Sequence, residues 1–165
     1  MNGSELPFGI SDFPMLSGYY YADKSFLIEE IVSSHLGKTI LLTRPLHYGK
    51  TLNLSMLEHF FSIDRKDSSP LFDNLSISDN AALRKKHQNA HPVIRLDLGG
   101  EDFEEAIASS FHLEKRPIDE LAPLCKERIH ALVEGTGEKA ILLVDDYDHP
   151  IQLTYLYGKY EELII

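Results

Sequence analysis

Residues 40–51, ILLTRPLHYGKT, set the expected architecture, because they join an apolar run to a helical pattern across a tight loop. The uninterrupted apolar residues of KTILLTRP, 38–45, predict a short strand buried on both faces, as in a parallel sheet. The following residues 50–61, KTLNLSMLEHFF, place apolar side chains at the spacing of an amphipathic helix. A strand, a tight loop and a helix in this order are the setting in which a phosphate-binding loop occurs.

The loop ends in Gly49, Lys50 and Thr51, the residue types with which a phosphate-binding loop ends. Backbone N–H groups around Gly49 would face phosphates at the helix N-terminus, where the helix dipole favours negative charge. Lys50 would reach the β- and γ-phosphates, and Thr51 would hold Mg²⁺ through its hydroxyl. The tripeptide alone is weak evidence, and its place between strand and helix strengthens it. The expected nucleotide-binding residues of this loop are Arg44, His47, Tyr48, Gly49, Lys50 and Thr51.

A second motif lies near the end of the chain, where the apolar residues 141–144 lead into Asp145 and Asp146. This is the Walker B pattern, in which a buried strand brings one carboxylate to Mg²⁺ and a second carboxylate orients the attacking water. Asp145 is therefore the expected metal ligand and Asp146 the expected catalytic residue. A core strand ending in a solvated acidic turn is the plain structural alternative.

The remaining pattern predicts an alternating α/β chain. Further apolar segments at 91–100 and 139–150 read as strands, separated by helical patterns, so the order is βαβαβ. This order predicts a parallel, doubly wound sheet with right-handed crossovers. In such a sheet, ligand-binding residues gather at the carboxyl edge of the strands.

Composition limits the classes of partner. The 165 residues fit one domain, and 26 acidic against 16 basic residues give a formal charge of −10, which argues against broad affinity for nucleic acids or anionic membranes. The single cysteine, Cys125, cannot form an intrachain disulfide and reads as a buried or partly buried thiol rather than a nucleophile. The first residues lack a signal-peptide pattern, and the longest apolar runs are about five residues, so we expect a cytoplasmic protein without a membrane span.

The chain resembles the predicted AAA-ATPase-like family, whose members combine an ATPase-like module with a downstream restriction-endonuclease-like domain. The resemblance implies a P-loop NTPase fold of the ASCE/AAA-like type, a three-layer sandwich with a parallel sheet, that uses ATP and Mg²⁺. An Arg-Pro start of the loop, as at Arg44, is normal for the family. The stretches that carry the resemblance are LPFGISDF, YYYADKSFLIEEI, LLTRPLHYGKTLNLSMLEHFF, LFDNLSI, KHQNAHPVIRLDL and ILLVDDYDHPIQLTYLYGKYEE.

The sequence departs from the family pattern within both motifs. Leu46 and His47 stand where relatives usually carry two arginines, and each lost phosphate contact would weaken binding roughly ten- to a hundredfold. Asp146 stands where relatives carry glutamate, so its carboxylate is one methylene short for positioning water. A displacement on the order of 1 Å can cost about a hundredfold in rate. We therefore expect binding to survive better than turnover.

The resemblance also predicts an incomplete module. It covers residues 1–165 as the N-terminal portion of one AAA-ATPase-like domain, with a poorly matching, shortened region at about 101–138. It ends before the strand that carries the sensor residue in related ATPases. Without that strand, the two motifs would flank a seam of unpaired backbone groups, which favours self-association or a partner domain.

Two functions remain open at this point. The first is an ATP-binding module, an Mg²⁺-dependent ATPase in type, with weak or absent hydrolysis in this chain alone. The second is a degenerate pseudo-ATPase that acts as a protein interaction module.

Two weaker alternatives concern metal binding. One is a nuclease-type cluster of Asp97, Asp145, Asp146 and Asp148. The other is a metal pair of His87 and His91, for which a plain loop is preferred. By resemblance, the segment from Tyr19 to Lys24 is expected near the base of the nucleotide, and a helix entry whose aromatic side chains cover the sheet edge is an equally weighted alternative.

Overall fold

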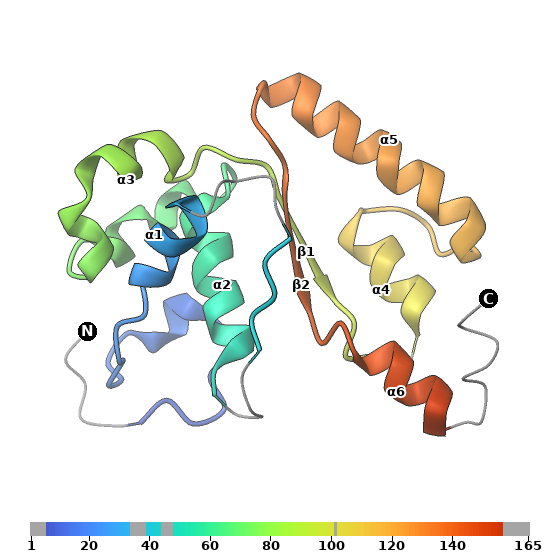
Figure 1. The fold of residues 1–165 in the computed structure, drawn as a ribbon, viewed down its shortest axis with the longest axis horizontal. Helices are drawn as coiled ribbons and strands as arrows, with labels where there is room; N and C mark the ends of the chain where they lie inside the picture. Colours follow the sequence, from blue (N-terminus) through green and yellow to red (C-terminus); the bar gives the residue numbers. More distant parts are fainter. Residues whose placement is uncertain (1–5, 34–38, 44–47, 101, 157–165) are drawn as a thin grey trace. The chain divides into compact units, whose positions relative to one another are not determined.

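The computed structural model describes residues 6–33, 39–43, 48–100 and 102–156. The chain divides into two compact units, Met1–His91 and Pro92–Ile165. Figure 1 traces the order of the elements along the chain. In the described residues, the first unit is helical, and the second unit combines helices with a small sheet.

The first unit is built around helix α2. Three α-helices and three short 3₁₀ helices make up its described part: η1 Phe13–Leu16, α1 Phe26–Ser33, α2 Lys50–Phe61, η2 Lys66–Phe72, η3 Ser76–Asp79 and α3 Ala81–His87. Helix α2 buries Met56, Leu57 and two phenylalanines. The ring of Phe72 stacks on Phe13 with a centroid distance of 5.1 Å and meets Phe60 edge-on at 5.2 Å. This aromatic core fixes η1 and η2 against α2, as expected for offset-stacked and edge-to-face ring pairs.

The second unit contains two parallel strands and three helices. Strands β1 Val93–Asp97 and β2 Ile141–Asp145 pair in register from Val93 opposite Ile141 to Asp97 opposite Asp145. The helices are α4 Phe103–Ser110, α5 Ile118–Thr136 and α6 His149–Leu156. The prediction of parallel strands at 91–100 and 139–150 is confirmed. Because the strands run parallel, Asp97 and Asp145 end at the same edge.

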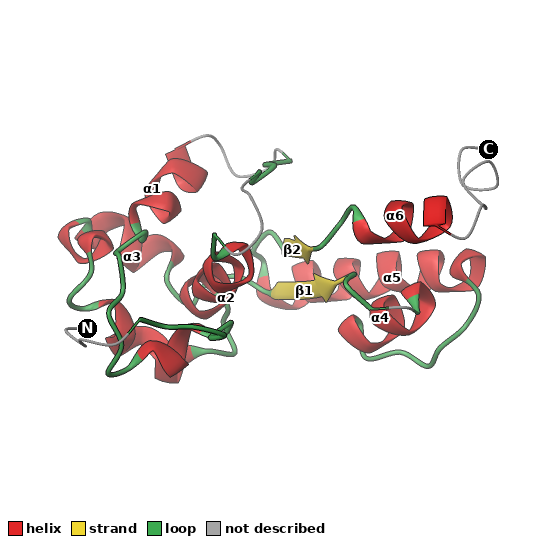
Figure 2. Ribbon diagram, turned by 90° about the horizontal axis from the view of Figure 1, so that it is seen from below, coloured by secondary structure: helices red, strands yellow, loops and turns green. Residues whose placement is uncertain are grey.

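Helices α4 and α5 lie along the same side of the two strands (Figure 2). Ile94 and Leu96, two residues apart on β1, point toward this side and join a buried cluster with Ile107 of α4 and Leu121 of α5. Asp102 caps α4, since its Oδ1 accepts a hydrogen bond from the backbone N–H of Glu105 at 2.9 Å. The helices thus cover one face of the sheet through apolar contacts.

The prediction of a strand at 38–45 is wrong for the described part of that segment, because residues 39–43 belong to no strand. Ile40 and Leu41 are 42% and 61% exposed rather than buried on both faces. An apolar run becomes a strand only where a neighbouring strand can satisfy its backbone groups. Within the described residues, the sheet consists of β1 and β2 alone.

The α/β class is therefore confirmed in a coarse form, as a mixed chain with a small parallel sheet. The three-layer P-loop sandwich stays a prediction. None of the helices in the described part of the chain combines the length and apolar character needed to cross a bilayer.

Candidate functional site

The loop residue Gly49 begins helix α2 in a left-handed conformation. Its φ of 75° and ψ of 33° place it directly before Lys50, the first residue of the helix. A left-handed backbone costs any residue with a Cβ about 1–2 kcal/mol, so glycine fits the position. No acidic side chain lies in the first turn of α2, and Thr51 follows Lys50 there. The free N–H groups of this turn thus meet no competing carboxylate from the helix itself.

Lys24 lies beside this helix end, although the sequence motif alone did not single it out as a site residue. Its Nζ donates a hydrogen bond to the backbone carbonyl of Tyr48 at 3.4 Å. The same Nζ lies 3.6 Å from the point where a Cβ on Gly49 would be. Two lysines, Lys24 and Lys50, therefore accompany Gly49. The expected place of the segment from Tyr19 to Lys24, near the base of the nucleotide, stays a prediction.

The backbone around Lys24 is held by hydrogen bonds on both sides. Asp23 accepts hydrogen bonds from the backbone N–H and the hydroxyl of Ser76, both at 2.6 Å, and from the N–H of Ser25 at 2.8 Å. The fully buried Ser25 hydroxyl accepts from the N–H of Ile77 at 3.0 Å. Asp23 and Ser25 thereby tie the start of α1 to η3.

Tyr21 adds a third tie, toward helix α2. Its hydroxyl accepts a hydrogen bond from the N–H of Lys24 at 3.4 Å and donates to Sδ of Met56 at 3.3 Å. Burial raises the pKa of Tyr21 to about 12, so its hydroxyl keeps its proton at neutral pH. The Lys24 backbone is thus fixed, while its side chain reaches the start of α2.

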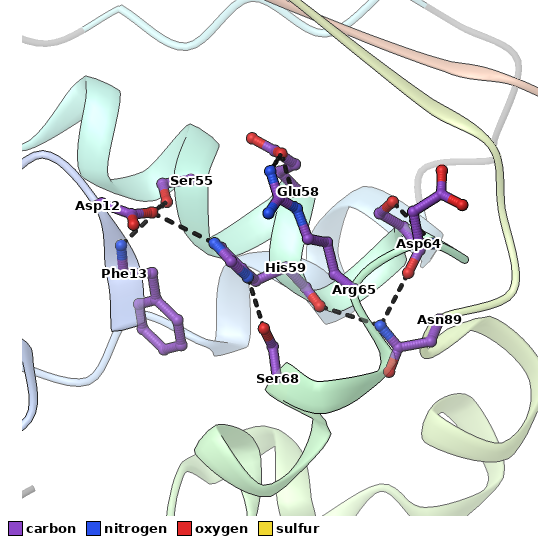
Figure 3. Close-up of polar contacts among 10 residues, drawn as sticks. Asp12, Phe13, Ser55, Glu58, His59, Asp64, Arg65, Ser68 and Asn89 are labelled. Carbon is purple, nitrogen blue, oxygen red and sulfur yellow. Dashed lines mark hydrogen bonds and ion pairs between the residues drawn. The ribbon is translucent and has the colours of Figure 1, made fainter. Parts of the chain in front are cut away.

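A partly buried polar network orients the middle of α2 (Figure 3). Nε2 of His59 lies 3.2 Å from Oδ1 of Asp12, and Nδ1 of His59 lies 2.7 Å from the hydroxyl of Ser68. The hydroxyl of Ser55 donates to the same Asp12 oxygen at 2.6 Å and accepts from the N–H of Phe13 at 2.9 Å. These contacts join η1, α2 and η2. Sequence reasoning missed them because a single helical histidine has no spacing signal.

In the second unit, Asp145 ends strand β2 with a nearly buried side chain. The residue is 3% exposed, and its Oδ2 lies 3.8 Å from Nη2 of Arg95 on β1. Its Oδ1 accepts a hydrogen bond from the N–H of Asp146 at 3.2 Å. A buried carboxylate requires such partners, because an isolated charge is costly to desolvate.

Asp146 turns the chain from β2 toward α6 with a left-handed backbone, φ 48°. Its carboxylate stands close to Gly99, since a Cβ added there would meet Oδ2 of Asp146 at 2.9 Å and Oδ1 of Asp97 at 3.2 Å. The N–H of Gly99 donates to Oδ1 of Asp97 at 2.9 Å. The carboxylates of Asp97 and Asp146 thus both lie close to Gly99, just after the end of β1.

The donor set fits Mg²⁺ only in combination with a ligand. Among the described residues, no group of three or more His, Cys, Asp or Glu side chains is placed to hold a metal ion. Mg²⁺ is usually bound through one or two carboxylates together with substrate phosphates and waters. Asp145 can serve as such a carboxylate, in competition with Arg95. The four-carboxylate nuclease cluster is not formed as a metal site within the described residues.

The structure brings some predicted residues together and leaves others undescribed. Tyr48, Gly49, Lys50 and Thr51 are consecutive at the start of α2 in the first unit, and Asp145 and Asp146 end β2 in the second. Arg44 and His47 lie outside the described residues.

Two other sequence features have plain structural positions. His87 ends α3 and His91 follows the turn after it; both are buried, with Nδ1 of His87 2.9 Å from Nε2 of His91. Their rings stack, which makes them an internal hydrogen-bonded pair. Cys125 is half-buried on α5, as predicted, and burial raises the pKa of its thiol. A raised pKa lowers the thiolate fraction, which opposes nucleophilic use.

Comparison with known proteins decides the family. A family model described as "Predicted AAA-ATPase" matches residues 7–164. The chain belongs to this predicted AAA-ATPase family. Within it, the chain is 30% identical to a protein of Azotobacter chroococcum mcd 1, titled "Uncharacterized protein in vnfD 5'region", over 169 aligned positions. The match covers 92% of this AAA-ATPase-like chain and 30% of that relative's length. No solved structure matches the chain significantly.

Proposed function

We propose that this chain binds ATP with Mg²⁺ through the loop that precedes α2. The observation that carries the proposal is the left-handed Gly49 directly before Lys50 and Thr51, in a chain of the predicted AAA-ATPase family. Lys50 would contact the β- and γ-phosphates, and Thr51 would hold Mg²⁺. Arg44, His47 and Tyr48 would complete the nucleotide-binding loop.

The Walker B role is proposed for the end of β2. Asp145 would supply a carboxylate to Mg²⁺, which itself would neutralise charge on the phosphates when bound. Asp146 would orient the attacking water. Its side chain is one methylene shorter than glutamate, and Arg95 competes for Asp145, so we propose that hydrolysis is weak or absent. Substitution Asp146→Glu is expected to raise ATP hydrolysis while leaving the Kd for ATP unchanged.

The test is titration of labelled ATP against the chain, with and without Mg²⁺. Wild type is expected to bind below about 1 mM nucleotide, and Lys50→Ala to weaken binding by about 1.5–3 kcal/mol, the free energy of one hydrogen bond to a charged group. Lys126→Ala, an exposed lysine on α5, is the matched control and should bind like wild type. Equal binding by Lys50→Ala and wild type would refute the proposal.

A pseudo-ATPase that binds another protein is the second candidate. It is favoured by exposed apolar side chains in the second unit, and by strands that each have one edge without a partner strand in the described sheet. The exposed side chains are Leu142, Ile151, Tyr155 and Leu156. Unpaired strand edges promote association between chains. Light scattering decides this candidate: a concentration-independent monomer that binds Mg-ATP tightly would exclude it.

A further inference from the structure

Lys24 presents a positive charge to the start of α2 that no carboxylate neutralises in the described part of the chain. Its ammonium has one described polar contact, the neutral carbonyl of Tyr48 at 3.4 Å. An ammonium carries three N–H donors and is strongly hydrated, so one long bond to a carbonyl leaves donors for an anion. The neighbouring Lys50 also forms no ion pair among the described residues.

The position of Lys24 is set by segments outside the loop. Its N–H donates to Tyr21, and its neighbours Asp23 and Ser25 are bound to η3. These bonds fix the Lys24 backbone relative to α2, because Tyr21 also donates to Met56. A cation with a fixed base and a flexible four-carbon stem can leave the Tyr48 carbonyl for a nearby stronger acceptor without moving the fold.

Two lysines contribute positive charge at the start of α2. Lys24 and Lys50 are next to the helix N-terminus, whose dipole is equivalent to about half a positive charge. The first turn of α2 contains no acid. By sequence, Leu46 and His47 bring no fixed positive charge, so Lys24 and Lys50 would add to Arg44 as sources of positive charge for a phosphate group.

We propose that Lys24 is a second phosphate-binding lysine, which moves from the Tyr48 carbonyl to an oxygen of the bound polyphosphate. The inference rests on the proposed function, and deepens it by naming a ligand contact from outside the loop. In the free protein Lys24 steadies Tyr48 and Gly49, and in the bound protein it neutralises phosphate charge. The ligand class is a nucleoside triphosphate or another polyphosphate.

The first experiment measures the Kd of ATP and of inorganic tripolyphosphate, with Mg²⁺, for the full chain and four variants. Lys24→Met is expected to raise both Kd values about ten- to a hundredfold, the range for one charge-assisted hydrogen bond. Lys24→Arg should retain most of the affinity. Lys126→Met removes the same charge from an exposed site on α5 and should bind like wild type. Unfolding by urea should change little for Lys24→Met, since the variant loses one exposed hydrogen bond and keeps the anchors of the segment.

The fourth variant, Lys50→Ala, separates the two proposals. If Lys50→Ala loses affinity while Lys24→Met binds like wild type, the Lys24 inference is wrong and the nucleotide site stands. If wild type does not bind, or Lys50→Ala binds equally well, the proposed function itself is wrong and takes the inference with it.

A second measurement uses wild type only and covers the case in which Lys24→Met does not fold. Lysine amines are acetylated with acetic anhydride and quantified by mass spectrometry, with and without Mg-ATP. Mg-ATP should protect Lys24 and Lys50 several-fold while leaving Lys126 unchanged. Equal acetylation of Lys24 in both conditions, beside protection of Lys50, would overturn the inference.

Discussion

Nε2 of His59 lies 3.2 Å from Oδ1 of Asp12, which joins the middle of α2 to the residue that precedes η1. The side chain of His59 is nearly buried, whereas that of Asp12 is half exposed. Ser55 supports the same carboxylate from the preceding turn of α2. Because α2 carries Lys50 at its start, this pair helps to hold the helix that bears the proposed phosphate site.

Ser55 offers a direct test of that network. Substitution Ser55→Ala leaves the N–H of Phe13 without its acceptor and removes a donor to Asp12. An unsatisfied buried group costs about 1–3 kcal/mol, so the free energy of unfolding measured in urea should fall by that amount. Ser109→Ala, an exposed helical site on α4, is the control and should change stability little. Equal effects at the two sites would contradict the proposed importance of the network.

Acid should destabilise the first unit through Asp12 and Asp23. Partial burial acts to raise the pKa of Asp23, but hydrogen bonds from Ser76 and Ser25 outweigh it and lower the pKa. Partial burial also acts to raise the pKa of Asp12, but hydrogen bonds with Ser55 and His59 outweigh it and lower the pKa. Each carboxylate therefore stabilises the fold fully above its unfolded pKa of about 3.9, and loses this contribution as pH falls through the lower folded value.

The Asp23→Asn variant checks this pH dependence. The free energy of unfolding is measured between pH 7 and pH 2.5, where the variant should be less stable at neutral pH and show a flatter decline below about pH 4. Asp79→Asn changes an exposed carboxylate at the end of η3 and should keep the wild-type slope. A wild-type slope in Asp23→Asn would show that Asp23 does not contribute.

Gly49 and Gly137 form a matched pair of left-handed glycines, with φ of 75° and 70°. An added Cβ at Gly49 makes only ordinary contacts, and at Gly137 it meets nothing within 4 Å. Alanine at either position should therefore lower the free energy of unfolding by the backbone cost alone, about 1–2 kcal/mol. Only Gly49→Ala should also raise the Kd for ATP. Comparable loss of ATP affinity in both variants would attribute the effect to general destabilisation.

Gly99 and Gly100 form a second pair, which tests the carboxylates at the strand ends. A Cβ at Gly99 would approach Oδ2 of Asp146 to 2.9 Å, whereas at Gly100 it meets nothing within 4 Å. Because side-chain ends move easily, Gly99→Ala should change stability by less than about 1 kcal/mol while displacing the carboxylates of Asp97 and Asp146. Carboxyl carbon NMR shifts of those two residues should change in Gly99→Ala and stay in place in Gly100→Ala. Unchanged shifts in both variants would mean that Asp146 does not lie against Gly99 in solution.

The sequence predicted those elements whose patterns are local. The helix over 50–61 follows from its own periodicity, and the strands at 93–97 and 141–145 from apolar runs that end in polar residues. The apolar residues 39–43 show the same pattern and form no strand, since pairing depends on a neighbour that no local pattern describes.

The residues of the candidate site also differ in whether a local sequence pattern identifies them. Gly49 and Asp145 could be assigned from motifs, because each motif is contiguous in sequence. The contact of Lys24 with Tyr48 spans 24 positions and exists only after α1 and α2 are packed. Arg95 could not be assigned as a partner of Asp145 either, because their proximity depends on the register between β1 and β2.

The left-handed backbone of Asp146 has a consequence for evolution at this position. Asp, Asn and Gly occupy such a conformation most readily among the amino acids, whereas longer side chains pay more for it. Substitutions at residue 146 are therefore limited by the backbone conformation of this turn, in addition to any selection on the proposed ATP hydrolysis. An aspartate at this position in a related chain therefore reflects the backbone conformation of the turn as well as the chemical role of the carboxylate. A related chain with glutamate must accommodate the longer side chain in the turn that leads to α6.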